Sequence, residues 1–154
     1  MAKIVLSNIF AVFLLLWPIT SAAQDAQVVV DQFTDLSAPT AAKMYRFTPN
    51  IVRIKPGATV EFLNSRGSHT VHSQSGLWPL DVPPVAIAGQ SSALVTFDAP
   101  GIYGLTCHRH GRYGMVMLVL VGDVDHTQVD VSTLPASDLA KSAYEGLLSE
   151  ITAQ

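Results

Sequence analysis

Residues 107–115 read CHRHGRYGM and place a thiol, two imidazoles and a thioether within nine consecutive positions. The residues before this segment, Ile102 to Thr106, and those after it, Val116 to Val121, both have the character of buried strands. Because the connecting loop is short, it can fold Cys107, His110 and Met115 around one point. The segment therefore predicts a strand–loop–strand unit with a functional site in its loop.

A fourth donor lies upstream in the sequence SHTVH at 68–72, where His69 stands at the end of another predicted strand. Two imidazoles, one thiolate and a weak thioether form the ligand set of a blue-copper electron-transfer site. Thiolate and thioether favour Cu(I), whereas imidazoles serve both oxidation states. The spacing Cys-x2-His-x4-Met therefore predicts a metal site made by His69, Cys107, His110 and Met115.

Each donor also has a simpler interpretation. A lone buried cysteine is usually an inert small apolar residue, Met115 and Met117 could both be core residues of one strand, and His110 could be a surface loop residue. The joint spacing between two strands favours the metal site. Zinc is chemically possible but gives Met115 no role. Since Cys107 is the only cysteine, an internal disulfide framework, four-cysteine zinc sites and cysteine-ligated iron–sulfur clusters are excluded.

Three further histidines are expected to stay outside this site. His72 lies three residues past His69, so strand alternation points it to the opposite face, where solvent is the expected neighbour. His108 should likewise point away from the site next to Cys107. His126 lies alone in an acidic segment and is expected at the surface. A second, catalytic metal centre is not expected within the chain.

The rest of the sequence from residue 24 reads as short strands separated by turns. Strands are expected at 28–30, 44–47, 51–54, 59–63 and 94–97, with a loop at 37–43 and no regular period over 74–89. Many short strands with Pro-Gly turns between them predict a β-sandwich. The tail changes to helical periodicity with Leu139, Ala143, Leu147 and Ile151 on one face and Ser137 as N-cap. This helix should either dock on the sandwich or mediate association.

The first 23 residues predict a signal peptide. Lys3 precedes an apolar run from Ile9 to Trp17, and Ser21-Ala22-Ala23 supplies the small residues of a cleavage site. An uncleaved anchor is the alternative. Charged residues make up only 14% of the chain and hydrophobic ones 49%, at a net charge of -3, which argues against disorder and against nucleic-acid binding. We expect an exported protein with a domain at 24–122 and an acidic helical extension at 123–154.

The chain resembles the cupredoxins, blue copper proteins, and most of all the pseudoazurin and plastocyanin type. The resemblance runs from about Val28 to Gly122 and includes FTP at 47–49, IKPGATV at 54–60, SHTV at 68–71, APGIY at 99–103 and the 107–115 loop. It implies an all-β, cupredoxin-like, eight-stranded Greek-key β-sandwich with a C-terminal α-helical tail. It also implies one type 1 Cu(I)/Cu(II) centre with His69, Cys107, His110 and Met115 as ligands, and an apolar surface patch around His110.

Two residues depart from the usual pattern beside the first histidine ligand. Ser68 stands where glycine is usual, and Thr70 stands where asparagine is common. The Thr70 N–H could still bond the cysteine sulfur, and its hydroxyl could tie the two loops together. Because hydrogen bonds around the ligands tune a metal site, the potential and geometry depend on these positions.

The resemblance implies a periplasmic carrier of single electrons rather than an enzyme. The expected partners are redox proteins, such as a copper nitrite reductase, a c-type cytochrome or a periplasmic dehydrogenase, and the carrier is expected to be a monomer. Arg109 and Arg112 flank His110 and would steer an acidic partner. Residues 33–122 carry a net charge of +3 and the tail −5, although the charges could simply keep the protein soluble. Copper binding for delivery is the alternative, and a Cys-His hydrolase fits poorly.

Overall fold

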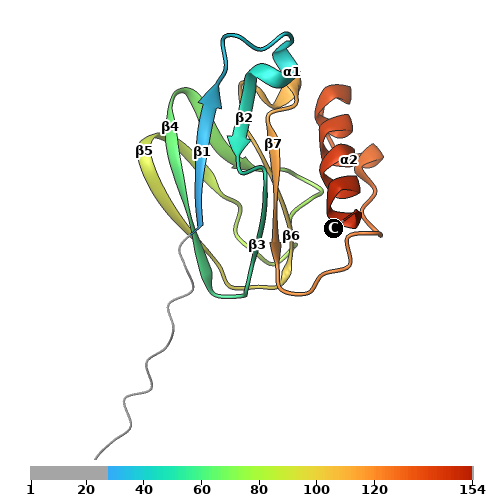
Figure 1. The fold of residues 1–154 in the computed structure, drawn as a ribbon. Coiled ribbons are helices and arrows are strands. Elements are labelled where there is room, and N and C mark those ends of the chain that lie inside the picture. The colour runs from blue at the N-terminus through green and yellow to red at the C-terminus, as the bar shows by residue number, and fades with distance from the viewer. Residues whose placement is uncertain (1–27, 154) are drawn as a thin grey trace, which may run out of the picture.

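The computed structural model describes residues 28–153, so the predicted signal peptide at 1–23 lies outside the described residues. The described chain is built mainly of strands and ends in a helix (Figure 1). The elements are, in chain order, β1 (Val28–Thr34), α1 (Ala41–Met44), β2 (Tyr45–Thr48), β3 (Ile51–Ile54), β4 (Ala58–Ser73), β5 (Ala86–Phe97), β6 (Gly101–Thr106), η1 (Gly111–Tyr113), β7 (Val116–Val121), η2 (Val131–Thr133) and α2 (Asp138–Thr152).

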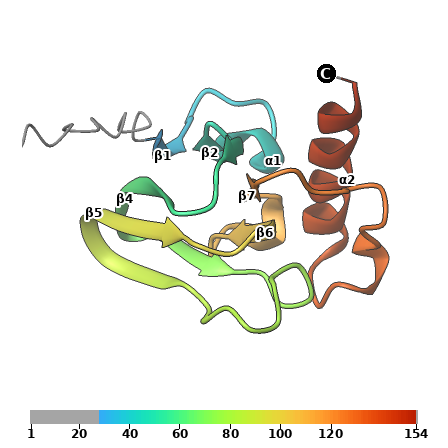
Figure 2. The ribbon, with the colours of Figure 1, turned by 90° about the horizontal axis from the view of Figure 1, so that it is seen from below.

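The strands form one sheet in the order β2-β1-β4-β6-β7-β3, with β5 paired to β4 off this path. Figure 2 shows that the sheet curls over on itself, and α2 stands outside it beside β7. The pairings of β1 with β4 and of β3 with β7 are parallel, while the other pairings are antiparallel. Curling lets the inner faces of distant strands meet in one core, as in a sandwich.

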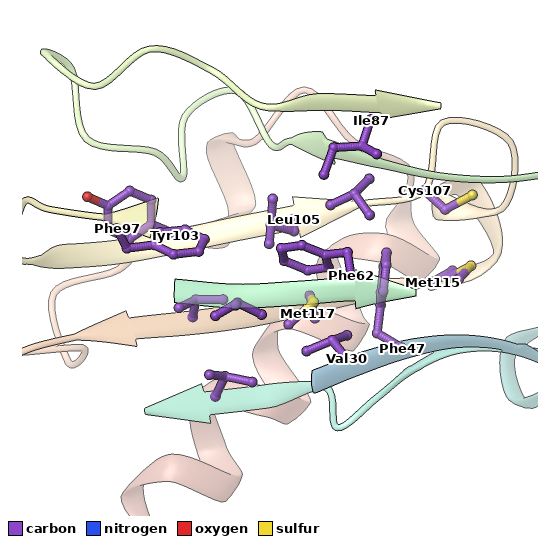
Figure 3. Packing of buried hydrophobic residues seen from close by; sticks show 14 of the residues in the cluster. Val30, Phe47, Phe62, Ile87, Phe97, Tyr103, Leu105, Cys107, Met115 and Met117 are labelled. Atoms are coloured by element: carbon purple, nitrogen blue, oxygen red, sulfur yellow. The ribbon is translucent and has the colours of Figure 1, made fainter. Parts of the chain in front are cut away.

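Every strand contributes to that core, because alternate residues point inward. Val30, Phe62 and Leu105 are fully buried at its centre. Figure 3 shows the two sulfur-bearing residues Cys107 and Met115 at one end of this cluster, and Phe97 and Tyr103 at the other. The loop at residues 107–115 is therefore anchored in the apolar core by its first and last residues.

Strand β7 is buried along its whole length, because both of its faces are covered. Met117, Val119 and Val121 enter the core inside the curled sheet. The alternate residues of β7 pack under α2 in a second apolar cluster, and the buried residues on that side of the helix are Ala140, Tyr144, Leu147 and Ile151. The Tyr144 hydroxyl also donates a hydrogen bond of 2.8 Å to the Leu105 carbonyl. The helix therefore docks on this chain, and Ser137 caps it as predicted, its Oγ accepting from the Ala140 N–H.

The structure confirms a β-rich fold with a C-terminal helix, and it corrects four details. β5 begins at Ala86, within the stretch expected to be irregular, and α1 occupies part of the expected loop. The described residues form seven strands where the resemblance implies eight, because β4 runs for 16 residues and its two halves serve different neighbours. Leu139, expected on the buried helix face, is 52% exposed. Among the described residues, no helix has the length and apolar character needed to cross a membrane.

Candidate metal centre

The loop between β6 and β7 is closed by its own main chain. The Cys107 N–H donates to the Met115 carbonyl at 3.1 Å, which places the two sulfur-bearing residues side by side at the start and end of the loop. The Gly111 N–H donates to the Cys107 carbonyl at 2.7 Å, and the Met115 N–H donates to the His110 carbonyl at 3.2 Å. These main-chain bonds close the loop and fix the positions from which its side chains project.

Position 111 needs a glycine because the loop leaves no room for a side chain there. A Cβ atom at this position would collide with the side-chain oxygen of Thr106, the last residue of β6. Gly114 follows η1 in the left-handed conformation at φ 94°, which glycine adopts without strain. Both glycines of the loop thus have a steric reason.

Three potential donor atoms converge where this loop meets β4. The side-chain donors of His69, Cys107 and His110 all lie within 4.8 Å of one another. Cys107 Sγ lies 3.6 Å from His110 Nδ1. The long strand β4 carries His69 into this position within the register shift between Ser65 and Thr70. The structure thus brings together three of the four predicted ligands in a metal-sized cluster.

The two nitrogens of His69 have different surroundings. Nε2 is hydrogen-bonded to the Thr34 hydroxyl at 2.7 Å, which fixes the orientation of the ring. Nδ1 is buried and has no hydrogen-bond partner among the described residues. A buried polar atom without a partner is costly, and a metal ion would satisfy it. Metal-bound histidines usually hold their second nitrogen in such a hydrogen bond.

The Cys107 sulfur is buried, and polar groups of β4 surround it. The residue is 1% exposed. Its thiol lies 3.7 Å from the Ser68 carbonyl, and the Thr70 hydroxyl lies 3.8 Å from the sulfur. The same hydroxyl accepts a 2.9 Å hydrogen bond from the His108 N–H. The expectation that Thr70 ties the two loops together is therefore confirmed for its hydroxyl.

Met115 completes the set of residues at this end of the core. It is fully buried, and its side chain lies at the same end of the apolar cluster as that of Cys107 (Figure 3).

The surroundings of the two histidines favour their neutral form. Burial lowers the pKa of His69, and the nearby Asp31 partly offsets this effect. Burial also lowers the pKa of His110, and nearby cationic groups lower it further. Neutral imidazoles are the form that binds metals, so the donor set fits a type 1 copper site.

His110 lies just below the surface, at 8% exposure. The ring of Tyr45 is stacked on the His110 ring, with centroids 3.7 Å apart and planes at 2°. Arg109 and Arg112 are both exposed and flank His110 in the chain. The Arg112 guanidinium lies 4.7 Å above the centre of the Tyr113 ring. Aromatic and cationic side chains are therefore found next to His110.

Sequence reasoning missed two residues of this site, Thr34 and Tyr45. Both belong to strands far from the loop in sequence, and neither residue type suggests a metal site. The one available signal is local, since Tyr45 shares the side of its short strand with buried Phe47. His72 and His108 lie outside the donor cluster, as predicted. Their rings nevertheless face each other, with centroids 5.4 Å apart.

Known proteins share both the sequence pattern and the fold. A family model described as copper binding proteins of the plastocyanin/azurin family matches residues 35–122. A pseudoazurin from Methylorubrum extorquens is 32% identical over 108 residues, covering 70% of this chain and 73% of that protein. A putative pseudoazurin from Rhizobium leguminosarum is 33% identical over 106 residues, covering 69% and 70%. The crystal structure of pseudoazurin from Methylobacterium extorquens matches with a TM-score of 0.68 at 29% identity, covering 81% of this chain and 98% of that one.

Proposed function

Because the chain belongs to the plastocyanin/azurin family of copper-binding proteins, we propose that it is a carrier of single electrons with one type 1 copper. We infer that His69, Cys107, His110 and Met115 are the ligands. The observation that carries this assignment is the buried, unpartnered Nδ1 of His69, which lies within 4.8 Å of the donors of Cys107 and His110. Copper, when bound, supplies a Cu(II)/Cu(I) couple to such a site.

The protein contributes a rigid frame to this chemistry. The main-chain bonds from Cys107 to Met115 and from Gly111 to Cys107 hold the loop closed, and the Thr34 hydroxyl holds the His69 ring. A close-packed core behind the donors resists displacement. A site whose donors stay in place on gain or loss of an electron has a small reorganisation cost, which suits a carrier better than an enzyme.

The surface beside His110 supports a role in transient encounters. Arg109 and Arg112 are exposed there, and positive groups steer a partner that carries an acidic patch. Encounters between redox proteins are small and short-lived. We propose redox proteins as donor and acceptor, of the kinds a copper nitrite reductase, a c-type cytochrome or a periplasmic dehydrogenase represent. The periplasmic location rests on the signal-peptide pattern of residues 1–23, with residues 24–122 as the copper domain and 123–154 as its helical extension.

A redox cycle followed by visible absorption tests this proposal. The purified protein receives one equivalent of Cu(II), then ascorbate, then ferricyanide. We expect an intense thiolate-to-copper band that bleaches and returns, that is absent in Cys107→Ser and that persists in His126→Ala. A weak copper spectrum would contradict the ligand assignment. Release of copper on reduction would instead indicate the delivery protein that is the alternative function.

A further inference from the structure

The second pair of facing histidines has no role in the proposed electron carrier. His72 lies near the end of β4, and His108 follows Cys107 in the loop after β6. Their ring centroids are 5.4 Å apart, and their planes are inclined at 54°. Neither ring forms a hydrogen bond with another described residue. The two imidazoles therefore face each other, and their nitrogen atoms have no hydrogen-bond partner in the described part of the chain.

The molecule supplies its own reference for this geometry. The His69 and His110 rings, whose donors cluster at the copper centre, have centroids 5.0 Å apart and planes inclined at 63°. The second pair differs from it by 0.4 Å (5.4 against 5.0) and 9° (54 against 63). The ring geometry of the second pair is therefore close to that of the first pair, whose two rings are proposed to bind one copper ion.

Both rings also line one hollow of the surface. This cavity of about 380 Å³ is lined by His72 and His108, and also by Ser73, Ser75 and Cys107. No carboxylate is among the described residues that line it. Arg112 lines it too, but its guanidinium is engaged above the Tyr113 ring. Imidazoles without carboxylates select zinc, copper or nickel over magnesium or calcium.

We propose that His72 and His108 form a second metal site, which binds one exchangeable divalent transition-metal ion such as Zn²⁺. The ion takes one nitrogen from each ring and fills its other positions with water from the open cavity. This site goes beyond the electron-carrier function, and only its reference geometry, the His69–His110 pair, rests on that proposed function. Because it offers two protein donors and stands open to solvent, it holds its ion less tightly than the buried centre.

The two sites share their backbone supports. His108 directly follows Cys107, and the Thr70 hydroxyl contacts both the Cys107 sulfur and the His108 N–H. His72 lies three residues beyond His69 on the same strand. The main chain that positions the proposed copper donors thus also positions the second pair, on the opposite side. This pair is therefore preorganised, although no hydrogen bond joins its two side chains.

A zinc titration followed by NMR tests the site in the whole protein. The chain is loaded with one equivalent of copper and reduced with ascorbate, which fills the buried centre with a diamagnetic ion. Zn²⁺ is then added while the ring signals of ¹⁵N-labelled histidines are recorded. We expect the His72 and His108 signals to shift together and to saturate at one equivalent of Zn²⁺. The His69 and His110 signals should keep their positions.

Variants separate a chelate from two independent surface histidines. His72→Ala and His108→Ala should each lower the zinc affinity by at least about tenfold, which is about 1.4 kcal/mol. His126→Ala is the matched control, because the ring of this partly exposed histidine is hydrogen-bonded to the Thr152 hydroxyl and lies outside the proposed site, and it should leave the affinity unchanged. Different midpoints for His72 and His108, saturation without either ring, or equal loss in the control would overturn the proposal. Since the ring signals also report folding, a misfolded variant is recognised directly.

Discussion

The molecule holds two pairs of facing histidines that are similar in ring spacing but differ in their surroundings. The His69–His110 rings are 5.0 Å apart and the His72–His108 rings 5.4 Å. Around the first pair lie the buried Cys107 and Met115, while the second opens into a surface cavity. Imidazole spacing alone therefore does not distinguish the two regions. The sulfur atoms of Cys107 and Met115, at the end of the buried core, are what the first region has and the second lacks.

Removing one imidazole from each pair in turn should give the largest contrast. We expect His69→Ala to lower copper affinity by at least about a hundredfold and to remove the intense visible band, because the first pair belongs to the proposed set of copper ligands. His72→Ala should leave both unchanged, since its ring lies outside the donor cluster. Copper titration against a competing chelator measures this. Equal losses in both variants would mean that the two pairs act as one site.

Gly111→Ala should damage both regions at once. The added methyl group collides with the Thr106 side chain, and the loop that carries Cys107, His108 and His110 must shift. We expect the free energy of unfolding to fall by about 1–3 kcal/mol, measured by urea denaturation of the metal-free protein. The matched control is Gly146→Ala in α2, where a Cβ meets nothing within 4 Å and should stabilise the helix by about 0.5–1 kcal/mol. Unchanged stability in Gly111→Ala would contradict the tight loop packing.

Thr70→Val tests the link that the Thr70 hydroxyl makes between the two histidine pairs. The variant removes the hydroxyl that accepts from the His108 N–H and contacts the Cys107 sulfur. We expect a loss of about 1–2 kcal/mol in stability and a changed reduction potential, because hydrogen bonds around a ligand tune its metal. Thr70→Ser keeps the hydroxyl and should retain most of both properties. Voltammetry and urea denaturation are the measurements, and an unchanged potential in Thr70→Val would exclude this tuning.

Tyr45→Leu should affect the first pair and spare the second. The tyrosine ring is stacked on His110 at 3.7 Å, and such contacts contribute about 0.5–1.5 kcal/mol beyond burial. We expect a stability loss of this size and a shifted His110 ring signal, whereas His72 and His108 keep theirs. Tyr45→Phe preserves the stack and is the control. A shift at His108 as large as that at His110 would show that the two regions are not separate.

The sequence allowed the proposed ligands to be foreseen because three of the four, Cys107, His110 and Met115, are close neighbours in one loop. His69 could be placed by its position at a strand end. Tyr45 and Thr34 could not, since their contacts join strands remote in sequence and follow no periodicity. The ligand roles themselves remain a prediction for the redox cycle to test.

The fold shows the same division. β7 was predictable from its continuous apolar run, whereas residues 86–93 of β5 were not. Their side chains are mostly exposed, and the main chain of β4 holds them in place. Main-chain pairing of this kind leaves little trace in composition. The helix was correctly expected, but its apolar spacing did not indicate that Ala140 and Tyr144 would be buried and Leu139 exposed.

Strand β7 packs its six successive residues alternately into two apolar cores, and this restricts the substitutions that the strand can tolerate. A strand with one wet face tolerates drift at every second codon, since the outward side chain meets only water. β7 has no such position, because Met117, Val119 and Val121 face the core and their neighbours face α2. We expect a mutational scan to find this hexapeptide the least tolerant of polar residues in the described chain, with alternate positions rescued by compensating changes in different layers.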